Sequence, residues 1–396
     1  MSLPLPIELF DIIAGYLRNN DLMKLRCVNK SLNQVALNKM FYQVNLYGSY
    51  EDITFKVQRI SEMVDRYHCQ GIKQLAIAST EFQHYGQTQF LNSIFYALMG
   101  MKLHKLMLMH PNIISKDQLQ LLLLTHPLRE LECHPLELDE EITWILLKYG
   151  HSLTNLSLKL SDIPFYQIIP KLSSTLQNLQ SVDLHAGSLK VFEINKLLSQ
   201  FKIKSLNLNQ IKITGKLKCM QHQLDLLRID DCDVDSADLF SLFNPRKLVL
   251  RKTNLSLCNF GKMTNLQVVS AHETRIHENQ CNDLVNLGVY KIRLGHVTLP
   301  FGGLSLLLKN KKLQYFEVDY LHCRDYVGAQ ILNDLPNLTY FRVGHTSPPM
   351  YSIVDVKQFY DLKTTIVLSS KAFVEDSQEL QEWCKHQDLP QHVLIS

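Results

Sequence analysis

The chain has 396 residues, of which 46% are hydrophobic and 20% charged, a balance typical of a folded protein rather than a disordered one. Forty-one Lys and Arg residues against 38 Asp and Glu residues leave a net charge of +3, which argues against a nucleic-acid-binding or membrane-binding protein. No apolar run approaches the ~18 residues of a membrane span, and the first residues lack the features of a secretory signal.

The nine cysteines are scattered along the chain, and no CxxC pair occurs. An odd number of unclustered cysteines indicates reduced thiols. This pattern predicts a cytoplasmic or nuclear protein.

Three short helices are predicted in the first forty residues. The first begins at Pro6, and its apolar residues repeat at helical spacing: Leu9, Ile12, Ile13 and Tyr16. A second helix is expected after a cap at Asn20-Asp21, and a third contains Leu32, Val35, Ala36 and Met40. So few residues cannot bury a large core alone, so some of their apolar surface must meet the rest of the chain or another protein. A helical lid on the next domain, with no partner, is the simpler alternative.

The residue order of this segment resembles the F-box domain. The matching elements are Leu5-Pro6-Ile7-Glu8-Leu9, Ile13-Ala14-Gly15-Tyr16-Leu17, Asp21-Leu22-Met23-Lys24-Leu25 and Val28-Asn29-Lys30, followed by Val35-Ala36. Asn29 stands where the family commonly has Cys, and Leu32 where it commonly has a bulky aromatic.

A six-residue pattern, apolar-x-x-apolar-x-apolar, recurs through almost all of the remaining chain. Its fourteen starts, 21 to 31 residues apart, are Phe41, Ile72, Leu103, Leu128, Leu153, Leu179, Ile203, Leu224, Pro245, Leu266, Val289, Leu313, Leu338 and Leu362. This period is typical of leucine-rich repeats, in which each unit is a strand followed by a helix or a short 3₁₀ turn. The two gaps of 31 residues leave room for a full helix each.

A small hydrogen-bonding side chain follows several of these strands. Cys232 occupies this position in the clearest repeat, and Thr253, Thr274 and Thr346 occupy it elsewhere. We expect these side chains to face backbone groups inside the turn. Helices are expected within 140–150, around 194–198, and from 239 to 242 after a cap at Ser236.

The C-terminal segment is expected to cover the last repeat, because the ends of a solenoid expose apolar surface. Phe373, Leu380, Trp383 and Cys384 fall roughly on one helical stripe. A capping helix is the simplest interpretation, and a partner-binding helix is the alternative. The sequence thus predicts an α/β chain with a three-helix F-box at 3–46. A curved leucine-rich-repeat solenoid of about 13–14 repeats follows at 41–369, with parallel strands on its concave face and helices on its convex face, and a cap lies at 370–396.

The resemblance to F-box/leucine-rich-repeat proteins implies a function. Such proteins bind the Skp adaptor, which joins them to a cullin–RING ubiquitin ligase, while their repeats select a protein substrate. Carried over onto this sequence, the adaptor-binding and inter-helix set is Leu5, Pro6, Leu9, Ile13, Leu17, Leu22, Leu25 and Val28. Replacing Pro6 by Ala together with Leu9 by Asp is then expected to abolish co-purification of the adaptor while the solenoid stays folded.

The residues between the apolar positions of each strand are expected to line the concave face. The candidate substrate-binding residues there are Arg228, Lys247, Arg251, Lys291, Arg293, Tyr315, Tyr340 and Arg342. Arg grips carboxylates and phosphates, and Tyr and Arg are favoured interface anchors. This set suggests a groove for an acidic or phosphorylated substrate segment. An ordinary solvated face, balanced by Asp230, Glu273, Glu317 and Asp319, is the alternative.

The residues that resemble catalytic or metal-binding motifs do not have the spacing or the residue types that those motifs require. His272-Glu273 and His277 miss the zinc-protease pattern by one residue. Asp231, Asp233 and Asp235 begin like a calcium loop, but Ser236 stands where Gly is required. We therefore expect a non-catalytic protein without a metal or other cofactor. Two other functions compete with this one. The chain could be a structural F-box subunit of a Skp-containing complex that is not a ligase, or it could be a plain leucine-rich-repeat scaffold or inhibitor.

Overall fold

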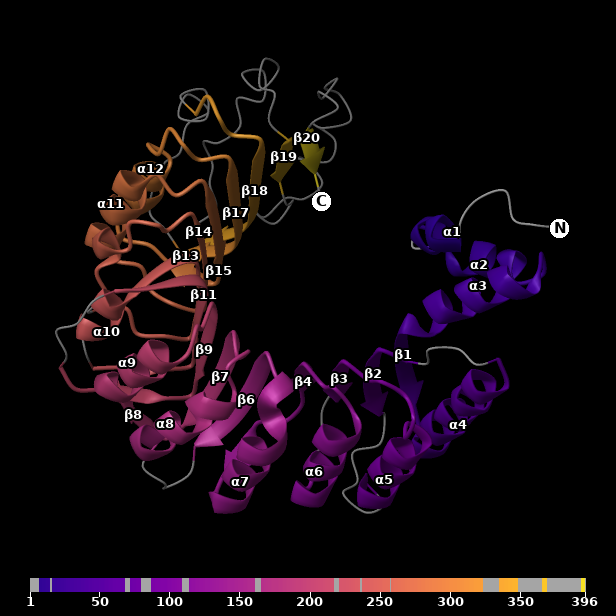
Figure 1. Ribbon diagram of the computed structural model, residues 1–396. Coiled ribbons are helices and arrows are strands. Elements are labelled where there is room, and N and C mark those ends of the chain that lie inside the picture. The colour runs from indigo at the N-terminus through magenta and orange to yellow at the C-terminus, as the bar shows by residue number, and fades with distance from the viewer. Residues whose placement is uncertain are drawn as a thin grey trace. The chain divides into compact units, whose positions relative to one another are not determined.

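The computed structural model describes residues 7–14, 16–67, 72–79, 87–108, 114–160, 165–216, 221–235, 237–256, 258–322, 335–347, 365–368 and 393–395 (Figure 1). The chain divides into two compact units, Met1–Asp183 with Gln200–Lys202 and Leu184–Ser199 with Ile203–Ser396. No helix in these described ranges is long and apolar enough to cross a membrane.

Unit 1 begins with α1 (Ile7–Ala14), α2 (Asn19–Leu25) and α3 (Lys30–Tyr42). Ala14, Leu22, Val35 and Ala36 form their shared core. Asn29 caps α3, because its side-chain oxygen accepts a hydrogen bond from the Leu32 amide at 2.9 Å. This capping accounts for an Asn where the F-box family commonly has Cys. The expected cap of the second helix is wrong: α2 starts earlier, so Asn20 and Asp21 lie inside it, and Arg18 precedes it without a side-chain capping bond.

The rest of unit 1 alternates strands with helices. Its elements are β1 (Gln43–Gly48), α4 (Tyr50–Tyr67), β2 (Gln74–Ser79), α5 (Gln87–Ala97), β3 (Lys105–Leu108), α6 (Lys116–Thr125), β4 (Glu130–Glu132), β5 (Leu136–Leu138), α7 (Glu140–Tyr149), η1 (Gly150–Ser152), β6 (Asn155–Leu160) and α8 (Phe165–Thr175), followed by β7 (Ser181–Ala186). Strands β1, β2, β3, β4 and β6 pair in parallel. The two 31-residue gaps hold α4, of 18 residues, and α5, of 11, as their lengths predicted.

Unit 2 continues the same alternation with shorter helices. Its elements are β8 (Ser188–Lys190), α9 (Val191–Gln200), β9 (Ser205–Asn209), β10 (Lys212–Thr214), β11 (His222–Asp230), β12 (Asp233–Val234), α10 (Ala237–Leu242), β13 (Phe243–Arg251), η2 (Phe260–Lys262), β14 (Val268–His272), α11 (Glu278–Leu287), β15 (Lys291–Gly295), β16 (Val297–Thr298), α12 (Gly303–Leu307), β17 (Tyr315–His322), β18 (Tyr340–Ser347), β19 (Thr365–Leu368) and β20 (Val393–Ile395). Strands β9, β11, β13, β14, β15, β17, β18, β19 and β20 pair in parallel in that order. The short strands β8, β10 and β12 form a second parallel sheet.

Each of the fourteen predicted repeat starts lies shortly before a strand or inside one, so the predicted solenoid is confirmed. The middle apolar residue of each pattern pairs with its equivalent in the next strand. In unit 2 this column is Leu206, Leu227, Leu248, Val269, Ile292, Phe316 and Phe341, all at most 1% exposed. Burying each such side chain stabilises the fold by roughly 1.5–3 kcal/mol, so the column holds the repeats together.

The turns after five strands of unit 2, β9, β11, β13, β14 and β15, share a backbone conformation. Gln210, Asp231, Lys252, Glu273 and His296 all have positive φ, between 47° and 54°. The Asp231 amide donates to the carbonyl of Arg251 at 2.8 Å, and that of Lys252 donates to the carbonyl of His272 at 3.0 Å. These bonds to the next strand offset the cost of a left-handed conformation in a residue other than glycine. Lys252, Glu273 and His296 are therefore turn residues rather than members of the strands' open face.

The predicted side chains inside the turns are confirmed at three positions. The Cys232 thiol lies 3.3 Å from the carbonyl oxygen of Leu208, and Thr274 Oγ1 donates to the carbonyl of Thr253 at 2.6 Å. Burial raises the pKa of the Cys232 thiol to about 11, so it remains a protonated donor. The side chain of Thr346 and residue Ser236 lie outside the described part of the chain.

Replacing Thr253 by Val is expected to lower the free energy of unfolding by about 1–3 kcal/mol. The Thr253 hydroxyl is buried, 2.8 Å from the carbonyl oxygen of Arg251 and 3.3 Å from that of Ile229, so its removal takes a donor from both carbonyls. Urea denaturation measures the change. Thr339 to Val is the matched control, because the Thr339 hydroxyl donates to the Gln314 carbonyl at an exposed site. Equal effects of the two variants would contradict the structural role of the buried hydroxyl.

The expected C-terminal capping helix lies mostly outside the described residues, including Phe373, Leu380, Trp383 and Cys384. The described C-terminal residues form a strand instead. Val393–Ile395 is β20, which pairs in parallel with β19. The sequence analysis missed this strand because it assigned 370–396 to a cap, although Pro390, Val393 and Ile395 follow the apolar-x-x-apolar-x-apolar pattern with a proline start, as at Pro245.

Candidate functional site

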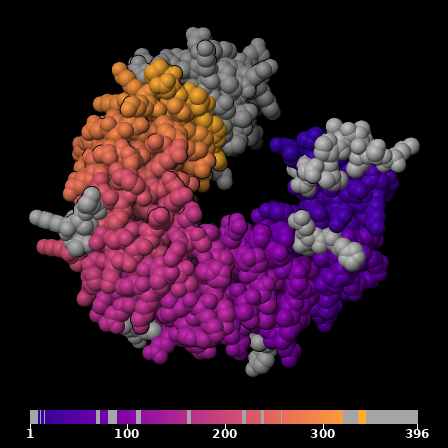
Figure 2. Space-filling view, in the orientation of Figure 1, coloured from indigo at the N-terminus to yellow at the C-terminus, as the bar shows by residue number. Residues whose placement is uncertain are grey.

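The first helix of unit 1, which belongs to the indigo part of the chain in Figure 2, carries an uncovered apolar face. Leu9, Ile12, Ile13 and Tyr16 are 43%, 58%, 46% and 86% exposed. Their spacing of three and four residues places them on one side of α1 and its C-terminal turn. Ala14, on another side of α1, is buried against the core shared with α2 and α3. The helix is thus anchored by one face and presents a second apolar face to solvent.

The predicted adaptor-binding residues separate into three groups. Leu9, Ile13 and Val28 are exposed. Leu17 and Leu25 are half-buried against the helix core. Leu5 and Pro6 lie outside the described residues.

Leu22 requires a correction. It is only 3% exposed and belongs to the core that holds the three helices together, so it is not available to a partner. The prediction missed Tyr16 and Met23, which are exposed. The helical spacing of Tyr16 with Leu9 was visible in the sequence, but periodicity alone does not distinguish a buried stripe from an uncovered one.

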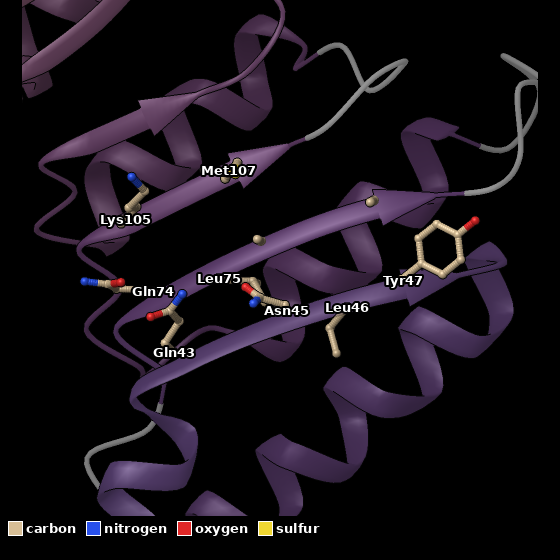
Figure 3. Close-up of a pocket in the computed structure, with 10 residues that line it drawn as sticks. Gln43, Asn45, Leu46, Tyr47, Gln74, Leu75, Lys105 and Met107 are labelled. Atoms are coloured by element: carbon tan, nitrogen blue, oxygen red, sulfur yellow. The ribbon is translucent and has the colours of Figure 1, made fainter. Parts of the chain in front are cut away.

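A groove of about 410 Å³ crosses the first three strands, on the face of the sheet opposite the helices (Figure 3). We call it the β1–β3 groove. The strand register sets its residues in rows, since Gln43 pairs with Gln74, which pairs with Lys105. The next row is Asn45, Ala76 and Met107, and Tyr47 lies beside Ala78 in the last. Two alanines therefore make a low floor between the larger side chains of Tyr47 and Met107.

The sequence analysis did not find this groove. Its residues carry no chemical motif, and they come from strands about 31 residues apart in the sequence. Only the strand register brings them together. At its β3 end, the ammonium of Lys105 lies 2.8 Å from Glu130 Oε2 and 2.6 Å from Glu132 Oε1, so this cation is already neutralised.

The predicted substrate-binding residues lie on the strands β11, β13, β15, β17 and β18 of unit 2, on the face opposite the helices. Register places Arg293 beside Glu317, and Glu317 beside Arg342. The Glu317 carboxylate accepts from both arginines, at 3.0 and 3.1 Å. The Tyr315 hydroxyl donates to the same carboxylate at 2.7 Å.

The two tyrosines extend this cluster. Tyr315 and Tyr340 stack with their ring centroids 4.4 Å apart, and the ammonium of Lys291 lies 3.9 Å from the Tyr315 ring centroid. Burial, and next the charge of Arg293, lower the pKa of Lys291. Burial likewise raises the pKa of Tyr315. Five of the eight predicted residues thus form one connected cluster around Glu317.

Arg228 and Arg251 have carboxylate partners of their own. Arg228 lies 3.2 Å from Asp230, and Arg251 lies 3.8 Å from Glu273. Every arginine of the predicted set is therefore paired within the chain, by Asp230, Glu273 and Glu317, three of the four carboxylates named in the alternative interpretation. Within the described residues, Lys247 has no ion pair. The arginine side chains remain 39–49% exposed, and exposed pairs of this kind contribute only about 0–1 kcal/mol, so a partner's carboxylate could compete for them.

No group of three or more His, Cys, Asp or Glu residues in the described ranges is placed to hold a metal ion. The described cysteines, Cys27, Cys133, Cys232, Cys258 and Cys281, are all free thiols.

Residues 3–44 match the family model of the F-box domain. No curated protein matches the chain. Among solved structures, the chain is similar to one from the complex of Rad7 and Elc1 in yeast, with 16% identity, coverage of 91% of this chain and 92% of that chain, and a TM-score of 0.43.

Two further solved structures are similar over long stretches. One is from the TLR13–ssRNA13 complex, with 16% identity, coverage of 86% of this chain and 44% of that chain, and a TM-score of 0.41. The other is the internalin InlF from Listeria monocytogenes str. 4b F2365, with 14% identity, coverage of 100% and 94%, and a TM-score of 0.35. TM-scores this low carry no argument, so the assignment of the repeats rests on the strands and helices of the chain itself.

Proposed function

We propose that this chain, which carries an F-box domain ahead of a leucine-rich-repeat solenoid, is the substrate-recognition subunit of a Skp–cullin–F-box ubiquitin ligase. The uncovered apolar face of α1 supports this function most directly. A single helix that leaves Leu9, Ile12 and Ile13 about half exposed has a surface suited to burial against another protein. In this proposal the Skp adaptor covers that face, and the repeats hold a protein substrate.

The protein itself performs no chemistry in this proposal and needs no cofactor. Its contribution is to hold the substrate near the ligase, and so it acts in the cytoplasm or the nucleus. Neither a nucleic acid nor a membrane is a partner in this scheme, in keeping with the net charge of +3.

Affinity purification of the full chain, with and without proteasome inhibition, tests the function. We expect the Skp adaptor and a cullin in both samples, and a client protein that accumulates only under inhibition. The adaptor without a cullin would indicate a structural subunit of another assembly. Absence of the adaptor would leave a plain repeat scaffold and contradict the proposal.

The cluster around Glu317 is proposed as a client-binding surface, because it combines two stacked tyrosines with paired arginines at partly exposed positions. Replacing Arg251 and Arg293 by Glu is expected to weaken client capture by about tenfold or more, since each change creates repulsion with Glu273 or Glu317 and reverses the charge offered to the client. Quantitative co-precipitation measures the loss. Adaptor recovery is the internal control, and unchanged client capture would show that this cluster is only solvated surface.

A further inference from the structure

Three basic residues precede strands β2, β3 and β4, next to the end of the β1–β3 groove that Gln74 and Lys105 line. Lys73, His104 and Arg129 each stand one residue before a strand, next to Gln74, Lys105 and Glu130. The His104 amide donates to the Lys73 carbonyl, and the Arg129 amide to the His104 carbonyl, both at 2.8 Å. The three residues are therefore direct neighbours across the sheet, about 4.8 Å apart. We call them the cation row.

The cation row has no compensating charge of its own. Within the described part of the chain, none of its three side chains forms an ion pair or a side-chain hydrogen bond, whereas adjacent Lys105 is paired with two glutamates. Burial, and next the charges of Lys73 and Arg129, lower the pKa of His104. Burial and the charge of Lys102 lower the pKa of Lys73 in the same way. The positive charges of Lys73 and Arg129 are therefore left without a paired carboxylate within the described residues.

The rows beside the cation row are suited to a peptide backbone. The next row along the strands contains the amide side chains of Gln43 and Gln74. The row after it contains Asn45, Ala76 and Met107. Within the described residues, the side chains of Gln43, Asn45 and Gln74 form no hydrogen bond. An amide side chain offers both a donor and an acceptor, which are the two groups that a peptide bond presents. The low floor at Ala76 and Ala78 leaves room for apolar side chains between Tyr47 and Met107.

We propose that the β1–β3 groove and the cation row together dock an extended segment of the client in which acidic and apolar residues alternate. The segment crosses the strands with its backbone over Gln43 and Gln74. Because alternate side chains of an extended peptide point to opposite sides, about 6.5 Å apart on each side, two carboxylates separated by one residue reach the cation row. The intervening apolar side chains then fall on the alanine floor.

This inference rests on the proposed function only in assigning the segment to a client protein. The binding of the peptide itself is measured on the protein alone. The cluster around Glu317 is less suited to an acidic segment, since its two arginines, Arg293 and Arg342, are already paired with the Glu317 carboxylate. The two surfaces lie in different units and are tested by different variants.

The test uses the purified full chain and a fluorescent probe peptide, acetyl-Gly-Glu-Leu-Glu-Leu-Gly, with binding followed by anisotropy. We expect saturable binding that weakens as salt is raised, and at least about tenfold weaker binding when glutamine replaces both glutamates. Replacing Lys73 and Arg129 by Glu should weaken binding by a similar factor. Replacing Ala76 by Phe, which fills the floor, should weaken it independently of salt.

The matched control is the pair Lys309→Glu and Lys311→Glu in unit 2, two exposed lysines outside both the β1–β3 groove and the cluster around Glu317, which should change peptide binding less than about twofold. In the same titration, bound carboxylates should raise the pKa of His104, seen by NMR of labelled histidine, because a nearby anion favours the imidazolium. Circular dichroism confirms that each variant is folded. Equal affinity for the glutamate and glutamine peptides, or for the wild-type chain and the Lys73/Arg129 variant, overturns the inference.

A phosphoserine peptide that binds about tenfold more tightly than the glutamate peptide would also overturn the choice of carboxylates as the ligand. Adaptor binding, measured on the same variants, separates this inference from the proposed function. Peptide binding without adaptor binding supports the groove and contradicts the ligase role. Adaptor binding without peptide binding contradicts the groove alone.

Discussion

Replacing Leu9 and Ile13 by Asp is expected to weaken binding of the Skp adaptor by at least about 100-fold. Each side chain loses roughly 1.5–3 kcal/mol of apolar burial at the interface, and each new carboxylate would have to be desolvated there. A factor of ten corresponds to about 1.4 kcal/mol, so the two losses together exceed the expected factor. Because Leu9 and Ile13 are already 43% and 46% exposed, the helix core of Ala14 and Leu22 should survive the change.

Calorimetric titration of the purified chain with the adaptor measures this effect. Tyr96 to Asp is the matched control, because Tyr96 is a 63% exposed aromatic on α5, outside the F-box domain. It should leave adaptor binding unchanged. Retained affinity in the Leu9/Ile13 variant, with the fold intact by circular dichroism, would remove α1 from the interface and weaken the proposed function.

Replacing Phe316 by Ala is expected to lower the free energy of unfolding by about 3–5 kcal/mol. Phe316 is fully buried in the central column of unit 2, and its ring centroid lies 5.7 Å from that of Phe341 in the next strand. No neighbour can refill the cavity without moving a paired strand. Because repeats contact chiefly their neighbours, the loss should be concentrated in β15, β17 and β18.

Urea denaturation gives the total loss, and hydrogen exchange locates it. Phe316 to Leu is the conservative control and should cost less than about 1.5 kcal/mol. Amides of β2 and β3, in unit 1, should keep their protection in both variants. Uniform loss of protection along the whole chain would contradict a local, repeat-by-repeat stability.

The strands were predictable from sequence because each of them must bury apolar side chains at the same positions. Leu227, Leu248 and Val269 occupy equivalent buried positions, and no polar residue is tolerated there. Helices were predictable from the length of each gap and from amphipathic spacing, as in α7. The structure differs from the sequence-based prediction where single hydrogen bonds set the backbone conformation. Lys252 and Glu273 adopt positive φ because their amides donate hydrogen bonds to the next strand, and no property of their side chains indicates it.

The candidate sites were less predictable than the fold. The sequence identified the cations and the balancing carboxylates of unit 2 but not which of them pair, since Glu317 meets Arg293 and Arg342 only through the register of three strands. Conversely, Ala76 and Gln74 became noticeable only when the register placed them in a groove. Leu22 and Leu9 look alike in sequence, and only packing distinguishes the buried residue from the exposed one.

The side-chain bonds inside the turns have a consequence for how the protein is made. Cys232 and Thr253 each donate to a carbonyl 24 residues earlier, and Thr274 to one 21 residues earlier. On the ribosome the earlier carbonyl emerges first, so each of these turns stays open until the following repeat has left the exit tunnel. Folding therefore trails translation by one repeat. Translation of an mRNA truncated in this region would yield a chain in which only the last turn lacks its side-chain hydrogen bond.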